Sequence, residues 1–308
     1  MGNHGHEHDH SSVNRRRLVI ALSITATIMI AEVIGSIVTG SLSLLVDAGH
    51  MLTDTLGLSV ALLTAQLMTR PATSRRTWGW KRMEVLGAAV QAAILLVVGT
   101  VAVVEGVQRF FTPPEVGAEG MLIIGAVGLL GNIVALLVLA GGRDSNLNLR
   151  AAFFEVGADA LGSVAVLVSA GVIALTGWMQ MDAVAGLLVA ALIIPRAVLL
   201  LRRTGSILLE TAPEGLDLDE VRAHLVALPH VVDVHDLHAS EVGTGLPVLT
   251  AHVVLEDECF RDGHSLELLE QMQNCIATHH DVAVEHSTFQ LESEAFRNAH
   301  EQQLRDYH

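Results

Sequence analysis

The sequence predicts a membrane α-helical protein, with six transmembrane helices followed by a cytoplasmic α/β domain. The first observation is composition: 51% of the 308 residues are hydrophobic and only 17% are charged, whereas about a quarter of the residues in a soluble domain are charged. The second is charge distribution, because residues 205–308 contain 20 acidic residues against four arginines while residues 1–204 are nearly neutral. The net charge of −15 argues against a nucleic-acid partner, whose binding surface would be basic.

Six apolar runs are long enough to cross a bilayer, which takes about 20 residues of helix. The first follows Arg15–Arg17. It is longer than the apolar part of a signal peptide and no small-residue cleavage site follows it, so we expect a retained helix. The six runs cover roughly residues 18–40, 42–68, 84–111, 119–140, 151–176 and 182–201.

Lysines and arginines are concentrated in alternate connections between these runs, and the opposite connections carry only Arg109. By the positive-inside rule we expect both termini in the cytoplasm of a multi-pass protein of the cell (inner) membrane. The acidic domain then lies in the reducing cytosol, where Cys259 and Cys275 are expected as free thiols. The clustered basic residues are Arg15–Arg17, Arg70, Arg75, Arg76, Lys81, Arg82, Arg143, Arg150, Arg196, Arg202 and Arg203.

The region after the sixth run has the pattern of a small α/β domain. Gly243, Gly245 and Pro247 predict a hairpin loop between its first two strands. Helices are predicted from the spacing of Leu218, Val221, Leu225 and Leu228 and of Leu266, Leu269 and Ile276, and strands at 231–238, 247–256 and 282–291. The predicted organisation is a histidine-rich arm (1–16), a transmembrane domain (17–204), a cytoplasmic α/β domain (205–292) and a polar tail (293–308).

Two of the predicted transmembrane helices carry pairs of ionisable residues four positions apart. His50 and Asp54 in the second run, like Glu155 and Asp159 in the fifth, stack on one face of a helix. Ionisable residues within a membrane are expected to face the bundle interior and to be functional. If the two faces meet, one imidazole and three carboxylates form a four-ligand site suited to a tetrahedral divalent ion such as zinc. A structural hydrogen-bond network between the helices is the alternative.

Other polar residues of the membrane region each allow two interpretations. Asp47 lies one turn from His50, where it could relay protons or line an access path, or else cap the start of its helix. Glu32 and Asn132 could support the site or serve in packing. Asp182 begins the sixth run, where an acid favours the helix dipole.

Histidines are abundant outside the membrane region. The N-terminal arm has them at alternate positions, and we expect weak metal capture there because such tracts bind metal weakly; a solvated polar tail is the alternative. Nine of the 16 histidines lie between residues 224 and 286, where they favour regulatory metal binding. The histidines of the arm are His4, His6, His8 and His10.

Three segments resemble the cation diffusion facilitator family, and more narrowly its bacterial cobalt–zinc–cadmium resistance branch. They are SLLVDAGHMLTD in the second run, AAFFEVGADALGSVAVL in the fifth and VHDLH in the soluble domain. The resemblance runs from about Arg16 to Leu291 and agrees with six spans plus a cytoplasmic domain. It implies a homodimeric zinc/proton antiporter whose soluble domain is metallochaperone-like.

The resemblance also implies roles for particular residues. Many zinc-transporting members have histidine where this chain has Glu155, and some carry an acidic ligand where it has Thr288. The loop at 69–82 has neither histidine nor acid, so a further metal site found there in some relatives is expected to be absent. The transport-site positions correspond to His50, Asp54, Glu155 and Asp159, and those of a dimer-interface metal site to His235, His252, His264 and His286.

The sequence therefore predicts a secondary transporter that exports Zn²⁺, with Cd²⁺ or Co²⁺ as further candidates, from the cytosol in exchange for protons. No GxxxxGK(S/T) loop occurs, which argues against an ATP-driven pump. Zinc is expected both as substrate and as regulatory ligand, with no organic cofactor. The expected partners are metal ions, protons, membrane lipid and a second copy of the chain.

Two other functions remain open at this point. A membrane-anchored metal sensor would leave the paired charges of the second and fifth runs unexplained. An intramembrane metalloenzyme needs an open metal position for water, which four protein ligands would fill. Its second run also lacks the glutamate base of an HExxH motif.

Overall fold

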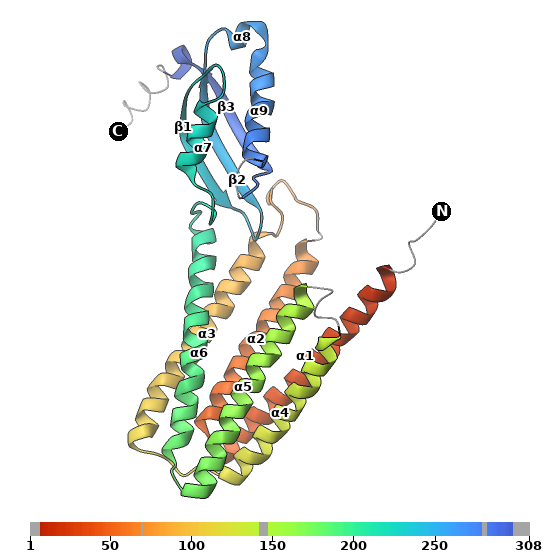
Figure 1. Cartoon of the computed structure of the whole chain (residues 1–308), viewed down its shortest axis with the longest axis vertical. Helices are drawn as coiled ribbons and strands as arrows, with labels where there is room; N and C mark the ends of the chain where they lie inside the picture. Colours follow the sequence, from red (N-terminus) through yellow and green to blue (C-terminus); the bar gives the residue numbers. More distant parts are fainter. Residues whose placement is uncertain (1–6, 69, 142–146, 279–281, 298–308) are drawn as a thin grey trace. The chain divides into compact units, whose positions relative to one another are not determined.

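A computed structural model describes residues 7–68, 70–141, 147–278 and 282–297 (Figure 1). It confirms the predicted fold class, with long apolar helices followed by a small α/β domain. The chain divides into two compact units. The first comprises residues 1–62 and 87–201, and the second comprises residues 63–86 and 202–308.

Six long helices occur at the positions of the six predicted runs. Within the described part of the chain, five of them contain a segment long and apolar enough to cross a membrane. The other, α2, is 27 residues long and carries three ionisable side chains in its first half. The helices are α1 (Glu7–Thr39), α2 (Leu42–Met68), α3 (Arg82–Phe111), α4 (Ala118–Ala140), α5 (Leu147–Thr176) and α6 (Gln180–Leu208).

Helix α2 is packed on two sides within the first unit. Leu42 and Val46 belong to an apolar cluster with α3 and α6, whereas Leu44 belongs to a second cluster with α4 and α5. Helix α4 in turn packs against α1 and α5. The ionisable residues of α2 therefore lie between neighbouring helices on more than one face.

The distribution of polarity in this unit is the reverse of that in a soluble protein. Large apolar side chains such as Val38 and Leu175 are 79% and 88% exposed, whereas Glu32, Asp47 and Asp159 are each only 1% exposed. An apolar outer surface with polar groups enclosed is the arrangement a bilayer requires, since lipid tails cannot solvate charge.

The N-terminus of α2 is capped by a carboxylate from another helix. Asp182, in the first turn of α6, accepts hydrogen bonds from the Ser41 and Ser43 hydroxyls at 2.6 and 2.7 Å, and from the Leu42 N–H at 2.6 Å. These groups include backbone donors that no residue within the helix can satisfy. The prediction that Asp182 begins its own helix is confirmed. Its carboxylate, however, accepts hydrogen bonds from the start of α2.

The second unit contains a three-stranded sheet in the order β1–β2–β3. Strand β1 (Val231–Glu241) pairs antiparallel with β2 (Pro247–Leu255), which pairs parallel with β3 (His286–Ser293). The turn between β1 and β2 is closed by a Val242 N–H bond to the Leu246 carbonyl, with Gly245 at a φ of +72°. The predicted hairpin is therefore present. The helices are α7 (Leu218–Val226), α8 (Cys259–Asp262) and α9 (His264–Thr278).

One apolar face of this sheet forms the core of the soluble domain with α7 and α9. Val221 and Leu225 of α7 and Val253 of β2 are fully buried there. Two details of the prediction were wrong. The buried face of α9 is Leu268, Met272 and Ile276, while Leu266 is 74% exposed, and the third strand begins at His286 instead of residue 282.

The connection between α2 and α3 belongs to the second unit. The ring of Trp78 packs edge-on against that of His286 at a centroid distance of 5.5 Å. Arg82 donates to Glu210 at 2.7 Å. Residues 63–86 thus belong to the compact unit that holds the sheet.

The carboxylate of Asp182 is expected to stabilise the packing of α6 on α2. Asp182→Ala leaves several buried donors without an acceptor, which should cost about 3 kcal/mol and lower the thermal unfolding temperature of the full chain in detergent. Asp182→Asn retains one oxygen acceptor and should fall between. Glu119→Ala, at an exposed acid in the first turn of α4, is the control. An equal unfolding temperature for Asp182→Ala and this control would refute the capping role.

Candidate metal centres

Three predicted ligands meet inside the first unit. The Nε2 atom of His50 lies 3.5 Å from Asp54 Oδ2 and 3.9 Å from Asp159 Oδ1. One ligand atom from each residue lies within 4.8 Å of the others. His50, Asp54 and Asp159 are 7%, 4% and 1% exposed. We call these three residues the membrane triad; its nitrogen and oxygen donors fit a small divalent cation.

The local sequence explains how the membrane triad assembles. His50 and Asp54 are one helical turn apart on α2, so their side chains point to the same side. Helix α5 supplies Asp159 opposite them. Gly162, one turn further along α5, gives room to Asp47 of α2, because a Cβ atom at Gly162 would collide with that carboxylate.

The fourth predicted ligand, Glu155, is paired with a cation instead of lying in the triad. Its Oε1 accepts a hydrogen bond at 3.2 Å from Arg196 Nη2. The Nη1 atom of Arg196 is also 3.9 Å from Asp54 Oδ2. In the sequence analysis Arg196 was counted among the basic residues at the end of the sixth run. A position facing this site was not predicted for it. An arginine directly after Pro195 inside an apolar helix was the only available signal.

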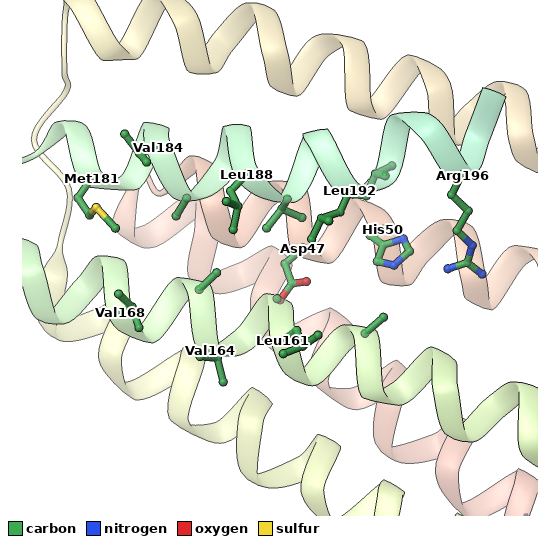
Figure 2. Close-up of a pocket in the computed structure, with 16 residues that line it drawn as sticks. Asp47, His50, Leu161, Val164, Val168, Met181, Val184, Leu188, Leu192 and Arg196 are labelled. Carbon is green, nitrogen blue, oxygen red and sulfur yellow. The ribbon is translucent and has the colours of Figure 1, made fainter. Parts of the chain in front are cut away.

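A cavity of about 500 Å³ adjoins the membrane triad. Its walls are mostly apolar side chains of α5 and α6, and Asp47, His50 and Arg196 are its ionisable lining residues. Figure 2 shows these three residues following one another along the cavity. His50 of the membrane triad thus borders a largely apolar space that carries a few polar groups.

A second buried polar cluster lies between α1, α4 and α5. Asn132 donates from Nδ2 to Ser163 Oγ at 3.3 Å. A Cβ atom on Gly128 would lie 2.9 Å from Glu32 Oε1 and 3.1 Å from Ser163 Oγ, so the carboxylate and the hydroxyl share the space that this glycine leaves open. Asn132 therefore has a polar partner in Ser163, and the carboxylate of Glu32 lies beside the same glycine.

Asp47 is not the cap of α2. The cap is provided by Ser41 and by Asp182, and Asp47 lies more than one turn inside the helix. Its carboxylate is 1% exposed and lines the same cavity as His50. Its place in the cavity agrees with the expectation that it lines an access path to His50.

The soluble domain contains a second group of metal-type ligands. Glu292 Oε1 lies 2.8 Å from His252 Nδ1, and Glu292 Oε2 lies 3.2 Å from His235 Nε2. His235 and His252 are directly paired across β1 and β2, and Gln290 donates to Glu292 at 2.7 Å. We call His235, His252 and Glu292 the cytoplasmic cluster.

Two of the four histidines predicted for this site lie elsewhere. His286 pairs with Val248, four residues from His252 on β2, which places it about 13 Å along the strand at about 3.3 Å per residue. His264 is the first residue of α9. Neither belongs to the cytoplasmic cluster. Glu292 was missed, although it continues the alternate positions of His286 and Gln290 on one face of β3.

Asp236 is a further oxygen donor beside the cytoplasmic cluster. It lies in an irregular part of β1, between the paired residues His235 and His238, with a φ of +50°. Its Oδ1 accepts from His238 at 2.9 Å, and this hydrogen bond lowers the pKa of Asp236. Its Oδ2 lies 3.7 Å from His252 Nε2. An ionised carboxylate is thus close enough to adjust toward a metal ion.

The predicted ligands of the N-terminal arm are only partly within the structure. His4 and His6 lie outside the described residues, and His8 and His10 belong to the first residues of α1.

The fold and the buried ligands together define a multi-pass membrane protein that handles metal cations. A family model described as the cation efflux transmembrane domain matches residues 18–209. The chain therefore belongs to the cation efflux family, a family of transporters and not of enzymes, as the resemblance implied.

Relatives whose names state a function align with almost the whole chain. The metal cation efflux system protein CzcD of Cupriavidus metallidurans is 38% identical over 94% of this chain and 90% of its own length. The zinc transporter ZitB of Escherichia coli is 40% identical over 94% and 92%. A protein of Bacillus subtilis named cadmium, cobalt and zinc/H(+)-K(+) antiporter is 33% identical over 94% and 93%.

A solved structure is similar to part of the chain. It is the metal-bound C-terminal domain of the CzcD transporter from Cupriavidus metallidurans, which is 32% identical, covers 25% of this chain and 99% of that chain, and has a TM-score of 0.22.

The cytoplasmic cluster should lose metal affinity when its one carboxylate is neutralised. Glu292→Gln keeps the size of the side chain but removes the charge, and zinc should bind there at least about tenfold more weakly. The measurement is calorimetric titration of the full chain carrying Asp159→Ala, which removes a membrane ligand. Glu294→Gln, an exposed acid two residues along the chain, is the matched control. If the two glutamine variants bind zinc equally, Glu292 is not a ligand.

Proposed function

We propose that this cation efflux protein is a secondary transporter that exports Zn²⁺ from the cytosol in exchange for protons. The observation that carries the proposal is the membrane triad, in which His50, Asp54 and Asp159 are buried within 4.8 Å of one another. Burial of such groups in a membrane is costly unless they serve a function. The zinc transporter name of the ZitB relative supports this substrate.

Glu155 is the proposed fourth ligand of the transport site. It lies one turn before Asp159 on α5, and its carboxylate bonds to the same arginine that approaches Asp54. A set of one imidazole and three carboxylates suits zinc. The name of the Bacillus subtilis relative, a cadmium, cobalt and zinc antiporter, supports Co²⁺ and Cd²⁺ as further candidate substrates.

Proton exchange follows from the chemistry of these ligands. His50 must be neutral to bind a metal, and metal binding displaces protons from ligand groups. Asp47, buried and lining the cavity beside His50, is the residue we propose for passing protons to the site.

Asp47→Asn should slow zinc uptake driven by a pH gradient while zinc binding in detergent is retained. Unchanged uptake would exclude Asp47 from the proton path.

The cytoplasmic cluster is proposed to regulate transport by binding zinc. It has three candidate ligands, and the rings of His235 and His252 are partly exposed, so metal can exchange with the cytosol.

The N-terminal histidines are proposed to capture zinc weakly at low concentration. Deletion of residues 1–10 tests this: the half-saturating zinc concentration for uptake should rise, and the maximal rate should not change.

The membrane orientation and the assembly are further proposals. The basic loop containing Arg75, Arg76 and Lys81 favours cytoplasmic termini by the positive-inside rule. Protease should therefore remove the soluble domain from inside-out vesicles and not from right-side-out ones. A homodimer in the lipid membrane is the assembly that the family resemblance implies, and light scattering of the purified protein should give twice the mass of one chain.

A metal sensor and an intramembrane metalloenzyme are the competing functions. The membrane triad disfavours the sensor, since sensing by the cytoplasmic cluster requires no buried ligands in α2 and α5. Membership in a family of cation efflux transporters disfavours the enzyme.

Loss of a ligand from the membrane triad should abolish transport. Asp54→Ala or Asp159→Ala removes an oxygen ligand together with a charge that balances the ion, and an enclosed site has little water to replace either. Initial zinc uptake into proteoliposomes under a set pH gradient should then fall to the level of empty liposomes. Glu119→Ala, at an exposed acid, should transport normally. Undiminished uptake by both triad variants, with normal insertion and folding, would contradict the proposed site.

A further inference from the structure

Arg196 places a permanent positive charge among the proposed ligands of the transport site. Its Nη2 donates to Glu155 Oε1 at 3.2 Å, and its Nη1 lies 3.9 Å from Asp54 Oδ2. A guanidinium does not lose its proton in proteins, so the charge is present whether or not the metal is. Described basic side chains elsewhere in the first unit do not approach the membrane triad this closely.

We propose that Arg196 is a tethered counter-ion that alternates with the transported metal at these carboxylates. The inference deepens the transport site proposed above and rests on it. Without metal, the carboxyl groups of Asp54, Glu155 and Asp159 gather in an interior with little water, where like charges repel strongly. Arg196 offsets one of these charges. An arriving divalent ion needs the same oxygen atoms, so metal and guanidinium compete for them.

The contacts of Arg196 are those of an exchangeable partner. One hydrogen bond holds it to Glu155, while its distance to Asp54 is longer than a hydrogen bond; a fixed structural pair is more often bidentate. Its side chain is 48% exposed, whereas that of Asp54 is 4% exposed. It also lines the cavity of about 500 Å³, which gives the side chain room to withdraw.

In this exchange Glu155 changes partner each time a metal ion binds or leaves. When metal enters, Glu155 leaves Arg196 and joins His50, Asp54 and Asp159 as the fourth ligand. When metal leaves on the other side of the membrane, Arg196 returns to Glu155 and to the vicinity of Asp54, which opposes rebinding. Arg196 should therefore weaken metal binding and speed metal release, so its removal changes affinity and turnover in opposite directions.

The test compares charge-removing and charge-keeping variants of the full chain. Arg196→Gln should lower the half-saturating zinc concentration for uptake into proteoliposomes roughly tenfold and also lower the maximal rate, because zinc is held longer. Arg196→Lys keeps the charge and should stay within roughly threefold of wild type in both. Arg202→Gln, at an exposed position of the same helix, should change neither. A folding defect would not produce a lower half-saturating concentration.

A double-mutant cycle with Glu155→Gln tests the partner. Zinc affinity is measured in detergent, and binding at the transport site is taken as the part lost in Asp159→Ala. With Glu155 neutralised, Arg196→Gln should increase affinity by a smaller factor than it does in the wild type. The inference is overturned by an unchanged or raised half-saturating concentration in Arg196→Gln, by equal defects in the lysine and glutamine variants, or by an identical factor in both backgrounds. No difference in binding between wild type and Asp159→Ala would instead overturn the transport site, and this inference with it.

Discussion

The cost of burying charge away from water is the constraint on which the first unit depends. An ion taken into a low-dielectric interior loses several kcal/mol of solvation unless partners replace the water. Two sets of buried polar groups show how partners are supplied: Asp182 accepts hydrogen bonds from donors at the start of α2, and carboxylate oxygens of Asp54 and Asp159 lie 3.5 and 3.9 Å from His50 Nε2. The contacts of Asp182 with α2 and of Asp159 with His50 join different helices, so they help to fix how α2, α5 and α6 pack.

The same constraint explains which features of the membrane unit could be predicted. Apolar runs of sufficient length and two pairs of ionisable residues at helical spacing are local properties. They predicted the six helices and a site of four residues, three of which, His50, Asp54 and Asp159, lie close together in the structure. The pairing of Glu155 with Arg196 is not local, since it joins residues 41 positions apart. Which face of α6 turns toward α5 depends on packing over its whole length, and an almost uniformly apolar helix gives little periodicity from which to read it.

In the soluble domain the ligand set could not be predicted from the sequence, because it depends on the register of the strands. The residue pattern identified the strands, and Gly243, Gly245 and Pro247 identified the hairpin between the first two. This pattern does not determine the register of β3 against β2, because parallel strands are joined by a long crossover and not by a short turn that would fix it. The observed register sets Gln290 opposite His252 and puts Glu292 two residues beyond it, so an acid at the end of the strand joins the histidines while His286 remains at the other end beside Trp78.

The two groups of candidate ligands differ in their exposure to water, and this difference supports the separate roles proposed for them. In the cytoplasmic cluster Glu292 is buried but the histidine rings are 30% and 21% exposed, so water can take the place of a departing ion. In the membrane triad every ligand is buried, and water cannot replace the ion as readily. Release there needs another positive charge to take over the carboxylates. Protons can do so in an antiporter, and Arg196 is a positive charge that the chain already holds at that position.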